Sequence, residues 1–114
     1  MTDKFKATTA AAWSRGPYEV ELPSGNKVKA YRPNLYVWKK TGQMPDEVWQ
    51  TILASSKDED VSFDASWDAI NWQISKCVVE PEVSLVQREG ALCVDDIDDI
   101  DRRALMIELG IGLG

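Results

Sequence analysis

The chain has 114 residues, 44% hydrophobic and 28% charged, a composition typical of one globular domain that excludes disorder throughout. It contains no histidine, which excludes Ser-His and Cys-His nucleophile pairs and imidazole zinc sites. The net charge of −6 is uneven, because residues 1–57 hold nine Lys/Arg and five Asp/Glu, whereas residues 58–114 hold four and fourteen. The acidic half argues against a general nucleic-acid binder, and the charge dipole would suit head-to-tail stacking or a charged partner.

No apolar run approaches the ~20 residues that a membrane helix needs, and residues 1–12 lack the apolar stretch of a secretory signal. We therefore expect a soluble intracellular protein that binds neither a membrane nor nucleic acid. The two cysteines, Cys77 and Cys93, belong to no CxxC pair. We expect buried free thiols, with a disulfide between them as the alternative.

Residues 1–16 are polar, small and rich in alanine and threonine. They predict a flexible N-terminal arm or a short helix, for which Trp13 is the candidate anchor on the rest of the fold.

Residues 18–32 alternate between apolar and charged side chains on both sides of a turn. This period of two predicts a β-hairpin, and the turn at residues 23–25 fits a three-residue loop with Gly25 in the left-handed conformation. Opposite charges face each other twice on one side of the hairpin, so both faces agree on one register. That register pairs Tyr18 with Ala30, Glu19 with Lys29, Val20 with Val28, Glu21 with Lys27, and Leu22 with Asn26.

Helical spacing and helix-end signals predict four helices after the hairpin. Asn34 can cap the first helix and Gly42 ends it, while Pro45 begins the second. Pro81 ends the third helix and Gly110 ends the fourth. The expected ranges are 35–41, 45–54, 64–79 and 99–109.

The third helix, which Ser62 or Asp64 can cap, carries one apolar stripe and is the expected core helix. Its stripe consists of Phe63, Trp67, Ile70, Ile74 and Cys77. The last helix repeats apolar residues at similar spacing, namely Ile97, Ile100, Ala104, Ile107 and Ile111.

Residues 82–88 predict a short strand or a connector, and residues 111–114 predict a loose C-terminal tail. The whole pattern predicts an α+β fold, mostly α, over residues 17–110. In this single domain an N-terminal β-hairpin is followed by about four helices.

The acidic run over residues 95–101 has two interpretations. Clustered carboxylates can hold calcium or magnesium, but the EF-hand spacing fails because Ile100 stands where an oxygen ligand is required. Acids at the start of a helix also stabilise the positive end of its dipole. We favour the helix start over an ion site.

The chain contains five tryptophans. Trp67 fits the core stripe, whereas Trp72, Trp38 and Trp49 lie off it. Tryptophans off the stripe cover a second core face or form an interface with a partner.

Five short motifs follow one another in the chain: Leu22-Pro23-Ser24-Gly25, Arg32-Pro33, Gly42-Gln43-Met44-Pro45, Val79-Glu80-Pro81, and the helix from Asp101 to Leu109. Their order, over residues 17–109, resembles the tail assembly chaperones of long-tailed, siphovirus-type bacteriophages. That family shows an LPSG-type hairpin leading to Arg-Pro, and a short helix with a Gly-x-Ile/Met-Pro exit. A Val-x-Pro stretch and a final helix follow.

The resemblance implies a non-catalytic protein, without a cofactor, that coats the tape measure protein in the host cell cytoplasm before the tail tube polymerises. It also implies a longer frameshifted form of the chain and the tail tube protein as further partners, and it is compatible with self-association. A small domain with surplus aromatic residues would bury the client's apolar stripe in repeated contacts. We expect the client-facing residues to be Leu35, Tyr36, Trp38 and Trp49.

Two alternatives stay open. One is a structural component of the tail, such as a completion or connector protein. The other is a metal-dependent enzyme that uses the carboxylates of residues 95–101.

Overall fold

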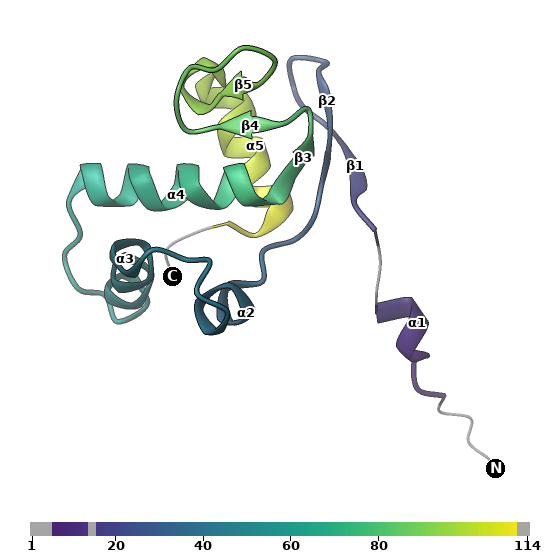
Figure 1. The fold of residues 1–114 in the computed structure, drawn as a ribbon, viewed down its shortest axis with the longest axis horizontal. Helices are drawn as coiled ribbons and strands as arrows, with labels where there is room; N and C mark the ends of the chain where they lie inside the picture. Colours follow the sequence, from purple (N-terminus) through teal and green to yellow (C-terminus); the bar gives the residue numbers. More distant parts are fainter. Residues whose placement is uncertain (1–5, 14–15, 112–114) are drawn as a thin grey trace.

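A computed structural model describes residues 6–13 and 16–111, and its longest helix, α4, lies between the other elements (Figure 1). The elements are α1 (Ala10–Trp13), β1 (Tyr18–Glu21), β2 (Lys27–Ala30), α2 (Leu35–Lys40), α3 (Asp46–Ser56), α4 (Phe63–Cys77), β3 (Val78–Glu80), β4 (Val83–Ser84), β5 (Leu92–Cys93), the short 3-10 helix η1 (Val94–Asp96) and α5 (Asp99–Leu109). The predicted α+β fold, an N-terminal hairpin followed by four helices, is confirmed.

The hairpin forms in the predicted register, with Val20 opposite Val28 and Glu19 opposite Lys29. Gly25 has φ +94°, in the left-handed region that glycine adopts without strain. The Leu22 N–H donates to the Asn26 carbonyl at 2.8 Å and closes the turn. The hairpin is therefore fixed by alternation and turn chemistry that are both local in sequence.

A third strand, β3, pairs antiparallel with β2, so Val78 and Val79 do not continue α4 as the sequence predicted. Pro81 favours extended backbone at the residue before it. The pairing of β3 with β2, in which Val78 lies opposite Ala30, gives this extended backbone its hydrogen-bond partners. Residues 82–88 contain the short strand β4, which runs parallel to β5.

The other helix boundaries lie within two residues of their predicted positions. Ser62 caps α4 by accepting a hydrogen bond from the Ala65 N–H at 3.1 Å, and Asp98 caps α5 by accepting from the Asp101 N–H at 2.8 Å. Gly110 ends α5 with φ +70°. Asn34 makes no side-chain capping bond to α2 within the described residues.

The core consists of two clusters on different sides of α4. The first packs the hairpin, the C-terminal half of α4 and α5 together around Ile74, Cys77, Leu105 and Leu109. The second joins α3 to α4 and consists of Met44, Val48, Ile52, Ala69 and Trp72. Burial on two sides explains why a single stripe did not describe α4. Trp72 is buried, whereas Phe63 is 74% exposed.

The predicted stripe on α5 is wrong at Ile100 and Ile107, which are 68% and 75% exposed. The buried face instead consists of Asp101, Arg102, Leu105 and Leu109. The two polar members of that face have partners far away in the sequence, which orients the helix differently from its apolar periodicity.

The two ends of the described chain differ in burial, since Trp13 is exposed and Ile111 is buried. Trp13 is 80% exposed, so it is not an anchor on this domain, and α1 extends away from the body (Figure 1). Ile111 is buried in the first cluster rather than loose. The rest of the predicted tail, and residues 1–5 and 14–15 of the predicted arm, lie outside the described residues.

Both cysteines are buried free thiols, as expected, and the alternative of a disulfide is wrong. Burial raises the pKa of the Cys77 thiol from 9.0 to about 12. The folded state therefore holds this proton more tightly than the unfolded state does.

Replacing Leu105 with alanine should lower the free energy of unfolding by about 2–5 kcal/mol, because it opens a cavity in the first cluster. Ile107→Ala, on the exposed face of the same helix, should change it by no more than about 0.5 kcal/mol. Urea unfolding followed by circular dichroism measures both. Equal losses in the two variants would contradict the burial of Leu105 and the exposure of Ile107.

The Cys77 thiol should make stability fall in alkaline solution. Its contribution is complete below pH 9.0, the unfolded pKa, and is lost as the pH rises toward about 12. The free energy of unfolding of the wild type should therefore fall more steeply above pH 9 than that of Cys77→Ala, by up to about 1.4 kcal/mol per pH unit. Parallel curves from urea unfolding at several pH values would contradict a raised pKa.

Candidate functional site

The four predicted client-facing residues all lie on α2 and α3, which the structure brings side by side. Tyr36 is 79% exposed, and its ring stands edge-on against Trp49 with 5.8 Å between centroids. Val37, next to Tyr36, is also exposed. We call Tyr36, Val37 and Trp49 the aromatic surface.

Leu35 and Trp38 lie behind this surface rather than in it. Both pack against the second core cluster, as the half-buried Trp49 also does, and the Trp38 ring stands edge-on to Trp72 with 5.4 Å between centroids. Edge-to-face pairs at this separation are favourable beyond the area that they bury. Leu35 and Trp38 therefore fix α2 on the domain, whereas Tyr36 is the residue that α2 presents to solvent.

Basic side chains border the aromatic surface. Lys39 and Lys40 occupy the last turn of α2, where positive charge complements the helix dipole. Lys39 forms an ion pair with Asp46 at 2.8 Å, which joins α2 to the start of α3. The hydrogen bond from Lys39 and its charge hold the pKa of the exposed Asp46 carboxyl below its usual value.

A second feature, which the sequence analysis missed, is a groove of about 550 Å³ between the start of α3, the middle of α4 and η1. Three carboxylates and no basic residue line it, so we call it the acidic groove. Its lining consists of Pro45, Glu47, Val48, Trp67, Asp68, Asn71, Trp72, Leu85, Val94 and Asp95. Four separate segments contribute to it, and no local pattern in the sequence signals that combination.

The buried Arg102 contacts three residues that line the acidic groove. Its guanidinium carbon lies 4.2 Å from the centroid of the Trp67 ring, a cation–π contact. It also donates to the Asn71 side-chain oxygen and, at 2.6 Å, to the Val94 carbonyl. Burial lowers the pKa of Arg102, and the charges of Asp99 and Asp95 oppose that shift. Arg102 thus positions two side chains and one backbone segment of the groove.

The acidic run begins α5, as the favoured interpretation predicted. Asp98 is the N-cap, and Asp101 accepts hydrogen bonds from the Ser24 N–H at 3.1 Å and from the Ser24 hydroxyl at 2.5 Å. Asp101 therefore fastens the hairpin turn to α5. Nowhere in residues 6–13 and 16–111 do three or more His, Cys, Asp or Glu side chains gather so that they could hold a metal ion.

A cavity of about 310 Å³ lies beside that contact, between the hairpin, β4 and the start of α5. Apolar side chains from Leu22, Val28 and Leu105 line it together with the Asp101 carboxylate. Because this carboxylate already accepts two hydrogen bonds from Ser24, we do not place the functional site there.

Comparison with known proteins gives no match to a family model, to a curated protein or to a solved structure. None of the helices in the described part of the chain is long and apolar enough to cross a membrane.

Arg102→Lys should lower the free energy of unfolding by about 1–3 kcal/mol, because an ammonium lacks the planar donors that satisfy Asn71 and the Val94 carbonyl. Arg103→Lys is the matched control, since Arg103 is exposed, and should change stability by no more than about 0.5 kcal/mol. Urea unfolding compares them. A loss in Arg102→Lys no larger than in the control would show that the buried network adds nothing to stability.

Proposed function

We propose that this protein is a tail assembly chaperone of a long-tailed bacteriophage, which binds the tape measure protein in the host cytoplasm and keeps it soluble. The observation that carries the proposal is the aromatic surface, where Tyr36 is exposed and braced by Trp49. The order of the sequence motifs supports the same function. The role is non-catalytic and uses no cofactor.

The rings of the aromatic surface suit an amphipathic helix as client. Each aromatic side chain can bury about 150–250 Å², and a braced ring loses little conformational freedom on binding. A client helix lying across α2 and α3 would cover Tyr36 with its apolar stripe, while acidic side chains beside that stripe would meet Lys39 and Lys40. This complementarity favours a helix with acidic flanks.

Each such contact is small, so a long helical client is best held by many copies. Repetition along one client raises the overall affinity far above that of a single contact. A longer frameshifted form of the chain could carry the tail-tube contact, so that coating and tube assembly occur on the same client.

Co-expression with the tape measure protein tests the proposal. Wild-type chaperone should bring the client into the soluble fraction and co-purify with it. Tyr36→Asp should reduce the co-purified client about tenfold or more, because it places a charge where an apolar ring is buried. Ile107→Asp is the matched control, since Ile107 is similarly exposed on α5, and should retain the client.

Two results would contradict the proposal. If the client stays insoluble and the wild type purifies alone, the chaperone function fails. Stoichiometric amounts of this chain in purified virions, measured by mass spectrometry, would then favour a structural tail component. If Tyr36→Asp holds the client as well as the wild type does, the aromatic surface is not the binding site.

A further inference from the structure

The acidic groove opens onto apolar side chains that the core leaves exposed. Phe63 stacks on Trp67 with 5.9 Å between ring centroids, so it extends the aromatic wall toward solvent. Leu85 lines the opposite wall, and both Leu85 and its neighbour Val86 are exposed. Exposed apolar residues around a hollow are typical of a binding site.

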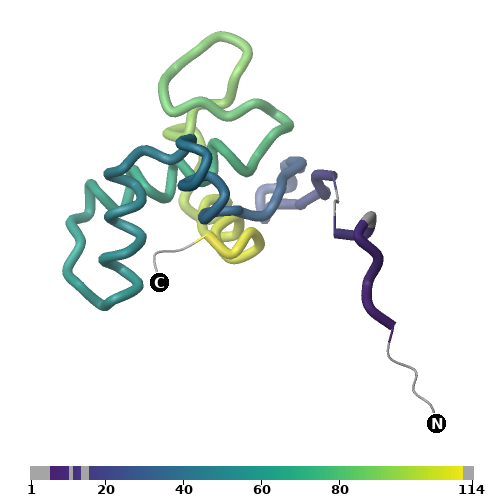
Figure 2. Tube along the Cα trace, turned by 60° about the horizontal axis from the view of Figure 1, so that its bottom comes forward, coloured from purple at the N-terminus to yellow at the C-terminus, as the bar shows by residue number. Residues whose placement is uncertain are grey.

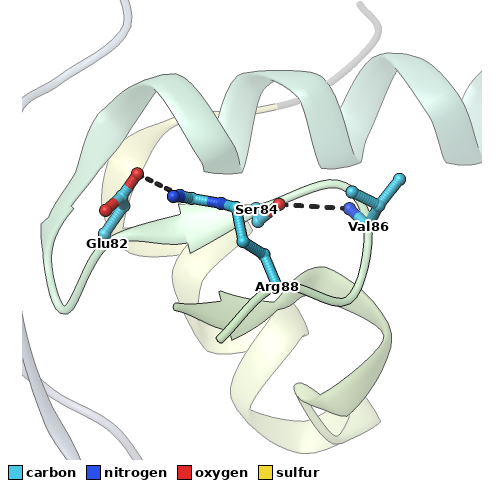
Figure 3. Close-up of polar contacts among 4 residues, drawn as sticks. All are labelled: Glu82, Ser84, Val86 and Arg88. Carbon is cyan, nitrogen blue, oxygen red and sulfur yellow. Dashed lines mark hydrogen bonds and ion pairs between the residues drawn. The ribbon is translucent and has the colours of Figure 1, made fainter. Parts of the chain in front are cut away.

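The wall that carries Leu85 is held in place by polar contacts across its loop. Figure 3 shows the ion pair between Arg88 and Glu82 and the hydrogen bond from the Val86 N–H to the Ser84 hydroxyl. The Leu92 N–H also donates to the Glu82 carbonyl at 2.8 Å. These contacts connect the two ends of the loop that carries Leu85.

The rim of the acidic groove carries three carboxylates, of which Asp95 also interacts with the charge of the buried Arg102. Glu47, Asp68 and Asp95 come from α3, α4 and η1. Within the described residues, the ion pairs are formed by other side chains. The groove therefore favours a segment that combines basic side chains with an apolar anchor.

The N-terminal segment of the same chain has this chemistry. Its first 16 residues contain three Lys/Arg and one Asp. Trp13, at the end of α1, is 80% exposed, and tryptophan is the residue most enriched among interface anchors. Lys6 is exposed as well.

We propose that the acidic groove binds the N-terminal segment of a second copy of this chain, with Trp13 as the anchor against Trp67 and Leu85. The basic residues of that segment lie against the carboxylates of the rim. Because groove and anchor are different surfaces, a bound pair of copies still has one free groove and one free anchor. The contact is heterologous, so it builds a ring or a filament rather than a symmetric dimer.

In the structure α1 lies away from the groove of its own molecule. Figures 1 and 2 both place α1 at the opposite side of the molecule from α3, and the longest dimension is 56 Å. The five residues from Trp13 to Tyr18 span at most about 18 Å. We therefore assign the occupant to a neighbouring copy.

Sedimentation velocity over a range of concentrations tests the proposal. The wild type should associate reversibly, and Trp13→Ala should weaken that association by at least about 30-fold, as expected for an interface anchor. Leu85→Glu should weaken it similarly. Both positions lie outside the two core clusters, so an unchanged melting temperature should accompany each loss.

Mixing the two variants separates this contact from any symmetric one. Trp13→Ala retains an intact groove and Leu85→Glu retains an intact anchor. Each should be monomeric alone, and an equimolar mixture should form a species of two chains that grows no further. Raising the salt from about 0.05 M to about 0.5 M should weaken the wild-type contact, because opposite charges are screened.

Tyr36→Ala is the control for an exposed aromatic residue outside the groove and should associate as the wild type does. The proposal is overturned if the wild type stays monomeric, if Trp13→Ala associates normally, or if the mixed variants do not combine. The proposal is also overturned if Leu85→Glu no longer keeps the client soluble while Trp13→Ala still does, because the groove would then hold the client. Client capture by Tyr36 is measured separately, so failure of one proposal leaves the other distinguishable.

Discussion

The arrangement of the C-terminal half depends on the burial of Arg102. Its guanidinium is held by the ring of Trp67, the amide of Asn71 and the carbonyl of Val94, so it contacts α4 and the segment before α5 together. Leaving such a cation buried without these partners would cost several kcal/mol, so they define where α5 can lie. Once Arg102 points inward, the neighbouring Asp101 points toward the hairpin turn.

This orientation also determines which apolar residues remain outside. With Arg102 and Leu105 inward, Ile100 and Ile107 lie on the opposite side of α5 and stay in solvent. Apolar periodicity alone favoured those two isoleucines for the core. It failed because the partners of the buried polar groups lie far away in sequence: Ser24 is 77 residues from Asp101, and Asn71 is 31 residues from Arg102.

Local signals predicted the elements well, and contacts between distant segments account for what they missed. The hairpin register followed from alternation and from a turn with Gly25, and the ends of α5 followed from the acidic run over residues 95–101 and from Gly110. The strand β3 could not be read from its own residues, because its pairing with β2 is non-local. For the same reason the sequence placed the aromatic residues on α2 and α3 but not the contact of Trp38 with Trp72, and it gave no sign of the acidic groove.

Some of the aromatic residues pack the core, and others are exposed to solvent. Trp72 and Trp38 close the second cluster and hold α2 against α4, whereas Tyr36 and Trp13 remain exposed. Both exposed rings have basic surroundings, since Tyr36 lies near Lys39 and Lys40 and Trp13 belongs to a segment with three Lys/Arg and one Asp. The proposed client surface and the proposed self-association surface share no residue, and they adjoin on α3, where Trp49 follows Val48. Copies joined head to tail would then present one Tyr36 per domain along a common client, and weak single contacts would add to tight coating without a large interface on any one copy.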